Sequence, residues 1–134
     1  MKIDIVASGK RKRALAKAAI KSGTGIIKIN NRIYTSLGQF HRLTISEPVE
    51  IAKSVLGSLN FDIAVRTSGG GIEGQMEAAR LAIAKAMFSF TKAEKLKKAF
   101  IAYDRNMMIA DTRRKEPYKP GDSKARAKRQ KSYR

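Results

Sequence analysis

After Asp111 the chain contains no Val, Ile, Leu, Met or Phe, and this limits the part that can fold by itself. A segment without large apolar side chains cannot bury enough surface to offset the conformational entropy lost on ordering. Residues 111–134 also hold ten Lys and Arg against three Asp and Glu. We therefore expect a globular domain over residues 1–110 and an extended basic tail over residues 111–134 that only a partner orders.

The positive charge of the chain restricts its partners. The 134 residues include 29 Lys and Arg against 11 Asp and Glu, a net charge of +18. A protein with this excess gains most from binding a dense polyanion. Membrane surfaces are also anionic, but the sequence has no apolar run of about 18 residues and no N-terminal stretch resembling a signal peptide. We expect a nucleic acid partner and no membrane contact.

Metal and disulfide chemistry have little basis in this sequence. There is no cysteine, and His41 is the only histidine. Zinc sites need several His or Cys ligands, so we expect neither a metal ion nor another cofactor. His41 is expected to be a surface or packing residue.

The first half of the chain shows the alternation typical of strands. One face, at period two, holds Ala14, Ala16, Ala18 and Ile20, and the other holds Arg11, Arg13, Lys17 and Lys21. The polar turn at residues 22–25 and the apolar residues 26–29 predict a second strand that forms a hairpin with the first. Asn30 and Asn31 predict the next tight turn, because Asn tolerates positive φ.

Helical patterns follow. Thr44 and Glu47 fit a capping box, and Gly57 fits a C-cap. The predicted elements are helices over residues 44–56, 73–90 and 92–103, a strand over 61–66 and a last strand over 107–110. Together they predict an α+β domain with one mixed sheet and helices packed on it.

A glycine-rich loop connects the strand at residues 61–66 to the helix after it. Gly69, Gly71 and Gly74 fit the G-x-G-x-x-G spacing of dinucleotide-binding loops. The acidic residue expected on a second strand about twenty residues later is missing, so we expect no nucleotide site. Two interpretations stay open, and both can hold. Glycine either provides the backbone freedom of a tight connection or lets an RNA phosphate approach the backbone amides.

The basic segments favour RNA over duplex DNA. Four cations follow one another at residues 10–13, and ten more lie after residue 110. Arginine binds phosphate bidentately, and tyrosines offer stacking planes for unpaired bases. No helix-turn-helix, zinc-finger or zipper pattern is present. For the lysines of the helix over residues 92–103, a solvated surface and an RNA contact both stay open.

Several short blocks occur in the order and spacing of one protein family. They are residues 9–12, 29–30, 47–48, 69–75, 79–84 and 111–116. The match spans essentially the whole chain, which resembles small-subunit ribosomal protein nine. The ending at residues 130–134 resembles the archaeal and eukaryotic branch. Bacterial members end differently, so their tail contacts do not carry over directly, whereas the terminal cation does.

The resemblance implies a fold, a function and partners. The fold would be of the α+β type found in ribosomal S5 domain 2. The function would be that of a non-catalytic structural protein of the cytoplasmic ribosome, in the head of the small subunit. Its partners would be small-subunit rRNA, neighbouring head proteins and the anticodon stem-loop of the peptidyl-site tRNA, with no small-molecule substrate.

The site residues lie along the basic segments and the glycine loop. By the resemblance, Arg134 would contact the tRNA, with Lys131 and Tyr133 near it. The residues expected to bind rRNA are Lys10, Arg11, Lys12, Arg13, Gly69, Gly70, Gly71, Gln75, Arg113, Arg114, Lys115, Lys119, Lys124, Arg126, Lys128 and Arg129. Two other functions fit parts of the sequence: a general RNA chaperone or nucleoid-type protein would share the composition, and a nucleotide-binding enzyme would share the glycine loop.

Overall fold

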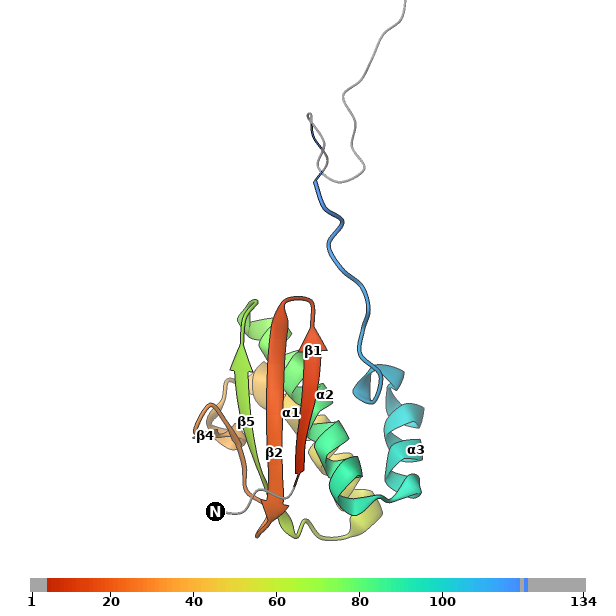
Figure 1. Ribbon diagram of the computed structural model, residues 1–134. Coiled ribbons are helices and arrows are strands. Elements are labelled where there is room, and N and C mark those ends of the chain that lie inside the picture. Colours follow the sequence, from red (N-terminus) through yellow and green to blue (C-terminus); the bar gives the residue numbers. More distant parts are fainter. Residues whose placement is uncertain (1–4, 119, 121–134) are drawn as a thin grey trace, which may run out of the picture.

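The computed structural model of the protein describes residues 5–118 and 120, which form one sheet with helices on a single face (Figure 1). The sheet has five strands in the order β1-β2-β5-β3-β4. They are β1 (Ile5–Arg11), β2 (Ala14–Ser22), β3 (Ile27–Ile29), β4 (Arg32–Ile33) and β5 (Phe61–Ser68). Neighbouring strands are antiparallel, except β3 and β5, which run parallel.

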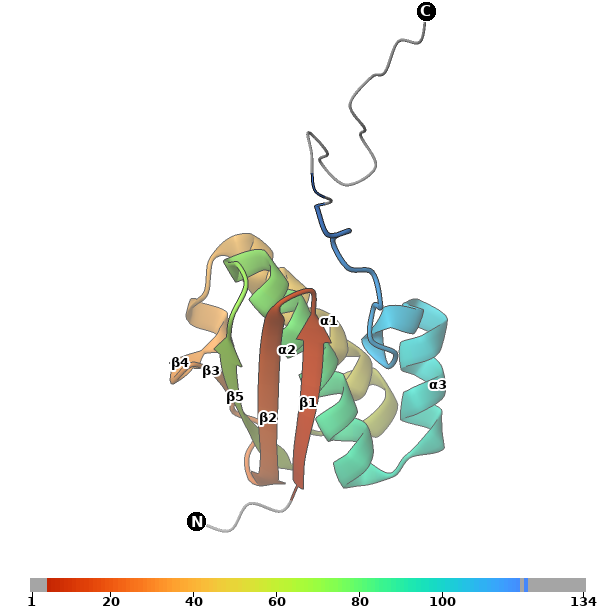
Figure 2. The same ribbon diagram turned by 45° about the horizontal axis from the view of Figure 1, so that its top comes forward.

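Three α-helices pack on one face of this sheet, and the core lies between the sheet and the helices (Figures 1 and 2). They are α1 (Gln39–Leu56), α2 (Ile72–Thr91) and α3 (Glu94–Tyr103), and the short 3-10 turns are η1 (Tyr34–Ser36) and η2 (Arg105–Met107). α2 packs on β1 and β2, and α1 packs on α2 and α3. Alternate strand residues such as Ala16, Ile20 and Ile63 point toward the helices and are fully buried. On the opposite face, the described residues place no helix or strand.

The predicted fold class, an α+β domain with one mixed sheet and helices packed on it, is confirmed. Two local predictions are confirmed as well. Asn30 and Asn31 have φ of 50° and 68° in the turn between β3 and β4, and Gly57 has φ of 78° directly after α1. Such local conformations follow from the residue type, which is why the sequence alone indicates them.

The predicted hairpin between residues 14–20 and 26–29 is wrong. β5 lies between these two strands, and β2 forms its hairpin with β1 instead, across the two-residue turn of Lys12 and Arg13. Alternation indicates a half-buried strand but does not identify the strand beside it. β1 itself gives little signal in the sequence, because the polar stretch of residues 8–11 interrupts its apolar pattern.

The predicted start of the first helix at Thr44 is also wrong, because α1 begins at Gln39. The hydroxyl of Thr44 donates to the carbonyl oxygen of Phe40 at 3.0 Å, within the helix, and does not cap it. A capping-box pattern can therefore occur inside a helix when the preceding turn is also helical.

The predicted last strand at residues 107–110 is replaced by the turn η2. The carboxylate of Asp104 accepts a hydrogen bond from the backbone nitrogen of Asn106 at 3.0 Å and so starts this turn. Met107 is fully buried under it. A short apolar run can be buried by a turn as well as by a strand, so the pattern did not decide between them.

The carboxylate of Asp62 holds the loop that carries the chain from β2 across the end of β5 to β3. Its Oδ1 accepts hydrogen bonds from the backbone nitrogens of Thr24, Gly25 and Ile26 at 2.9, 3.0 and 2.9 Å. The hydrogen bond from Ile26 contributes most to lowering the pKa of Asp62, and burial opposes the shift. This loop explains how β3 reaches the far side of β5.

We predict that Asp62→Asn lowers the free energy of unfolding at pH 7 by about 1 kcal/mol, because the loop is partly open to solvent. The pKa of Asp62 is lowered in the folded state, so its stabilisation is complete above the unfolded value of about 3.9 and is lost as pH falls through the folded value. Urea unfolding at neutral and acid pH should show the gap between wild type and variant closing in acid. A gap that does not change with pH would contradict this.

The closest approach between sheet and helices lies at Gly9 of β1. A Cβ built there would lie 2.3 Å from the carbonyl oxygen of Ala78 and 2.7 Å from the backbone nitrogen of Ala82, both in α2. Both alanines are fully buried. β1 and α2 therefore pack at a backbone separation that only glycine permits at this position.

Gly9→Ala should lower the free energy of unfolding by about 1–3 kcal/mol, because the added methyl group must push two backbone segments apart. The matched control is Gly38→Ala, where φ is −55° and an added Cβ meets only the Nδ1 atom of His41 at 4.0 Å. The control should change the stability by about 0.5 kcal/mol or less. Urea unfolding followed by circular dichroism measures both, and equal losses would show that Gly9 does not set this separation.

Candidate nucleic-acid interface

Three segments that are far apart in the sequence meet around one hollow at the end of the sheet. They are the β1–β2 turn, the glycine loop between β5 and α2, and the start of the C-terminal segment. The hollow has a volume of about 810 Å³. It is lined by Arg11, Lys12, Arg13, Ala14, Gly70, Gly71, Gly74, Arg113, Arg114 and Lys115. Because none of these lining residues is acidic, the hollow favours an anion.

The β1–β2 turn presents two exposed cations to this hollow, Lys12 and Arg13. Among the described residues, no carboxylate forms an ion pair with either. Lys12 has φ of 54°, a left-handed conformation that costs a residue with a side chain about 1 kcal/mol. Glycine or asparagine would adopt it more easily. The turn alone therefore does not explain why a lysine stands here.

The glycine loop packs directly on this turn. Gly69 and Gly70 have φ of 72° and 60°, and a Cβ on them would lie 2.6 Å from the carbonyl oxygen of Arg13 and 2.9 Å from the backbone nitrogen of Ala14. Gly71 differs, because its φ of −98° suits any residue and an added Cβ would meet no described atom within 4 Å. The fold requires the first two glycines, whereas Gly71 is the N-cap of α2, a position that serine, asparagine or aspartate fill at least as well.

Gln75 braces the glycine loop from α2. Its Nε2 donates to the carbonyl oxygen of Gly69 at 3.0 Å, and its Oε1 accepts from the hydroxyl of Thr67 at 3.2 Å. Asn30 holds the same threonine from β3, donating to its hydroxyl at 2.8 Å and accepting from its backbone nitrogen at 3.0 Å. Both ends of the Gln75 amide are thus engaged within the protein.

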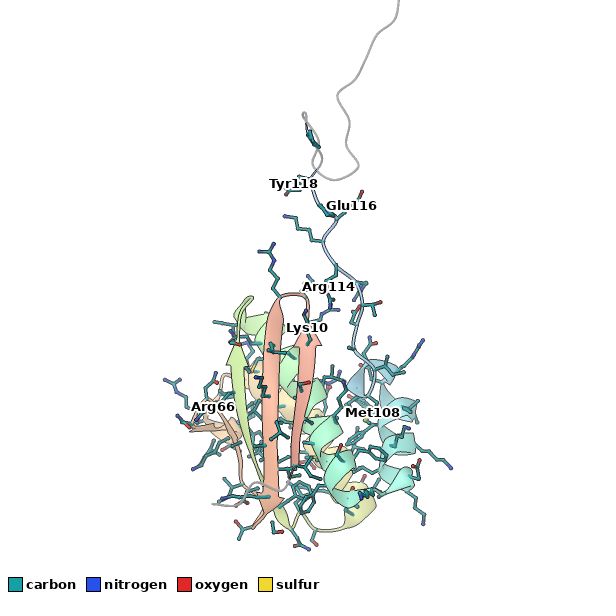
Figure 3. All side chains as sticks on the ribbon, in the orientation of Figure 1. Lys10, Arg66, Met108, Arg114, Glu116 and Tyr118 are labelled. Carbon is teal, nitrogen blue, oxygen red and sulfur yellow. The ribbon has the colours of Figure 1, made fainter. Side chains whose placement is uncertain are left out.

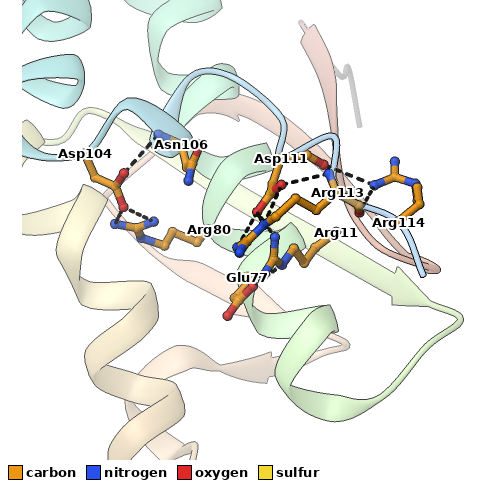
Figure 4. Close-up of polar contacts among 8 residues, drawn as sticks. All are labelled: Arg11, Glu77, Arg80, Asp104, Asn106, Asp111, Arg113 and Arg114. Atoms are coloured by element: carbon orange, nitrogen blue, oxygen red, sulfur yellow. Dashed lines mark hydrogen bonds and ion pairs between the residues drawn. The ribbon is translucent and has the colours of Figure 1, made fainter. Parts of the chain in front are cut away.

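Asp111 fixes the place where the C-terminal segment leaves the domain (Figure 4). Its carboxylate is 12% exposed, pairs with Nη1 of Arg11 and accepts from the backbone nitrogen of Arg113 at 2.9 Å. Arg11 also pairs through Nε with Glu77 of α2, at 2.6 Å. The segment is therefore tied to β1 and α2, and beyond it the chain runs away from the sheet past Arg114 and Tyr118 (Figure 3).

A second arginine joins the helices beside this anchor. Nε of Arg80 lies 2.6 Å from a carboxylate oxygen of Glu47 in α1. Both its Nη atoms donate to Asp104 at 3.1 Å (Figure 4). Arg80 and Arg11 are each paired with two carboxylates. Their charges are neutralised within the domain, in contrast to those of Lys12 and Arg13.

Of the cations that follow Asp111, Arg113 pairs with this aspartate through Nη2 at 2.8 Å. Nη1 of Arg114 donates to the carbonyl oxygens of Asp111 and Arg113, at 3.1 and 2.8 Å. Nζ of Lys115 lies 4.5 Å from the ring centre of Tyr118, a cation–π contact. These side chains keep their charge available for an anionic partner.

The residues predicted from the sequence to bind rRNA divide into groups. Those around the hollow are Arg11, Lys12, Arg13, Gly70, Gly71, Arg113, Arg114 and Lys115, while Gly69 and Gln75 support the loop and exposed Lys10 precedes the turn. The predicted residues Lys119, Lys124, Arg126, Lys128, Arg129, Lys131, Tyr133 and Arg134 lie outside the described part of the chain.

The anchoring role of Asp111 and Glu77 is absent from the sequence-based prediction. An Asp two residues before Arg113 is a signal for a side-chain turn, and it could have indicated the first of these contacts. No signal in the sequence connects Glu77 with Arg11. Within the described residues, no group of three His, Cys, Asp or Glu side chains could hold a metal ion, and no helix is long and apolar enough to span a membrane.

The sequence matches the family model of ribosomal protein S9/S16 over residues 9–134. Two archaeal relatives are the small ribosomal subunit proteins uS9 of Methanococcus vannielii and Methanococcus maripaludis. Each is 43% identical over 129 residues, which cover 94% of this chain and 95% of the relative. The resemblance inferred from the sequence is confirmed. The chain belongs to the ribosomal protein S9/S16 family and is a structural constituent of the small ribosomal subunit, not an enzyme.

Proposed function

We propose that the hollow at the end of the sheet binds the phosphate backbone of rRNA in the head of the small subunit. The observation that carries this proposal is the convergence of cations from two distant segments around a glycine loop, without an acidic residue among the lining residues. Phosphate contacts supply most of the sequence-independent affinity of such proteins. Arginine at this site adds bidentate hydrogen bonds to phosphate oxygens.

The conformation of Lys12 and the missing side chain at Gly71 both favour a hollow that binds phosphate over a hollow that contacts only solvent. A lysine at positive φ places its ammonium group at the hollow in spite of the backbone strain. As the N-cap of α2, Gly71 could be replaced by serine or asparagine without loss to the helix, whereas a polymer that approaches its backbone closely would exclude a side chain. The two interpretations of the glycine loop thus divide by residue: Gly69 and Gly70 serve the tight connection, and Gly71 serves the partner.

The basic tail over residues 111–134 is proposed to continue from this site along rRNA. The contacts of Asp111 with Arg11 and Arg113 support a boundary between domain and tail at this aspartate. The tip would contact the anticodon stem-loop of the peptidyl-site tRNA through Arg134, with Lys131 and Tyr133 near it. The domain itself would lie beside other proteins of the head.

The two alternative functions have less support. A nucleotide-binding enzyme would need a strand after α2 for its acidic residue, and in the described chain α2 leads directly to α3.

A loosely bound RNA chaperone would be removed from small subunits by a high-salt wash, because log K falls by about 0.9 per neutralised phosphate for each decade of salt. A structural protein should stay bound.

We predict that Lys12→Asn combined with Arg13→Gln weakens binding to small-subunit rRNA. Asparagine retains the turn, so the loss should come from two missing phosphate contacts, and the slope of log K against log salt should fall by up to about 1.8. The control, Lys95→Gln with Lys98→Gln, removes the same charge from the exposed side of α3. Filter binding over a salt series measures the affinity of both variants. An equal loss of affinity in both would show that total charge, and not the position of the cations at the hollow, determines binding.

Gly71→Ala tests the proposed approach of a phosphate to the glycine loop. The variant should lose no more than about 1 kcal/mol of stability, the cost of alanine at the N-cap of α2, because the added methyl group meets no described atom. Its affinity for rRNA should nevertheless fall, by about tenfold if one phosphate contact is lost. Unchanged affinity in a stable variant would exclude a close approach at this residue.

Deletion of residues 131–134 tests the role assigned to the tip of the tail. We expect the variant to fold and to assemble into small subunits, with weaker retention of tRNA in the peptidyl site. Arg134→Gln should act in the same direction but less strongly, since one exposed charge among many is partly redundant. Lost assembly with normal tRNA affinity would contradict this division between domain and tail.

A further inference from the structure

The face of the sheet opposite the helices carries exposed cations on four of its five strands. Alternate residues of each strand point to this face, which the described residues leave uncovered (Figures 1 and 2). Its exposed cations are Lys10 in β1, Lys17 in β2, Lys28 in β3 and Arg66 in β5. Figure 3 shows Lys10 near the end of β1 and Arg66 on the side toward β4.

Two of these cations are direct neighbours across the sheet. Lys17 of β2 is in register with Arg66 of β5 on one side and with Ser8 of β1 on the other. Like charges that face each other on adjacent strands destabilise a sheet. Among the described residues, no carboxylate forms an ion pair with either cation. The fold therefore keeps an unfavourable pair that only an anion outside the domain would stabilise.

The side chains between the cations are small. Ala19 lies in register with Ala64, which is in turn opposite Lys28, and Ser8 is in register with Lys17. Leu15, between Lys10 and Ser68, is the larger exception and is half-buried. Asp62 is the one acidic residue on this face within the described chain, and backbone amides of the neighbouring loop bind its carboxylate. The small side chains leave a hollow of about 500 Å³ beside Ala19, Lys28 and Ala64, where a polymer backbone can approach the strands closely.

We infer that this open face is a second RNA-binding surface, which takes the phosphate backbone of an rRNA segment through Lys17 and Arg66. The inference rests on the proposed function and extends it, because the face adjoins the hollow. Lys10 on the open face is followed directly by Arg11, and Ser68 by the glycine loop. One RNA segment that leaves the hollow can therefore continue over the sheet.

The chemistry of the face favours RNA over a protein partner. Interfaces between proteins usually have a core of aromatic or large apolar residues with few charges. Here the exposed large apolar residues lie at the edges of the face. They are Val6 on β1, Ile26 directly before β3 and Ile33 on β4, whereas Lys17 and Arg66 occupy the middle. Neighbouring rows of side chains are about 7 Å apart along a strand, which spaces the cations for a chain of phosphates.

The test compares Lys17→Gln combined with Arg66→Gln with the control Lys95→Gln combined with Lys98→Gln. Each removes two positive charges from the full-length protein. Binding to a transcript of the head domain of an archaeal small-subunit rRNA is measured by filter binding over a salt series. We expect the open-face variant to bind about tenfold or more weakly near 0.1 M salt, with a slope lower by up to about 1.8, and the control to change much less.

Folding of the open-face variant is checked by urea unfolding. The variant removes two like charges that face each other on adjacent strands. The urea midpoint of unfolding should therefore be unchanged or higher than that of the wild type, so weaker binding cannot be ascribed to unfolding. Unchanged rRNA affinity, or an equal loss in the control, overturns the inference. If the variant of Lys12 and Arg13 loses affinity while the open-face variant does not, the hollow stands as the rRNA site and the open face is excluded. If the wild type itself does not bind the transcript, the proposed function fails too.

Discussion

The close packing of β1 on α2 at Gly9 is the contact on which the other features of this domain depend. Arg11 lies two residues farther along the same face of β1, and the short separation brings its guanidinium to Glu77 of that helix. Arg11 also holds Asp111, the first residue of the basic segment. The backbone contact at Gly9 thus positions Arg11, and Arg11 holds the start of the C-terminal segment against β1 and α2.

Charge is distributed unevenly over the molecule, in a way that its net value of +18 does not reveal. Arg11 and Arg80 each have two carboxylate partners and connect secondary-structure elements. Lys12 and Arg13 at the hollow, and Lys17 and Arg66 on the open sheet face, form no ion pair with a carboxylate of the described residues. Unpaired positive charge therefore gathers on two adjoining surfaces, which is the arrangement a polyanion can neutralise.

The sequence predicted what local chemistry determines and failed where distant segments meet. Positive φ at Asn30 and Gly57 follows from residue type, whereas the neighbour of β2 depends on a loop that Asp62 holds from another strand. The same limit applies to the site. Its basic segments were recognisable one by one, but their convergence requires the topology. In the run of four cations at residues 10–13, the local sequence does not indicate that Arg11 forms ion pairs and Lys12 does not.

The most direct test of the RNA site is directed hydroxyl-radical cleavage of rRNA from single cysteines, since the chain has none of its own. An iron chelate attached at Gly71→Cys and, in a second protein, at Thr112→Cys would be assembled into archaeal small subunits. Gly71 lines the hollow, and Thr112 directly precedes Arg113, which lines it too. We therefore predict cleavage at overlapping nucleotides of the head rRNA, with a different pattern or none from Lys98→Cys on α3. Separate cleavage sites for the first two positions, or none at all, would contradict the assignment of the hollow to rRNA.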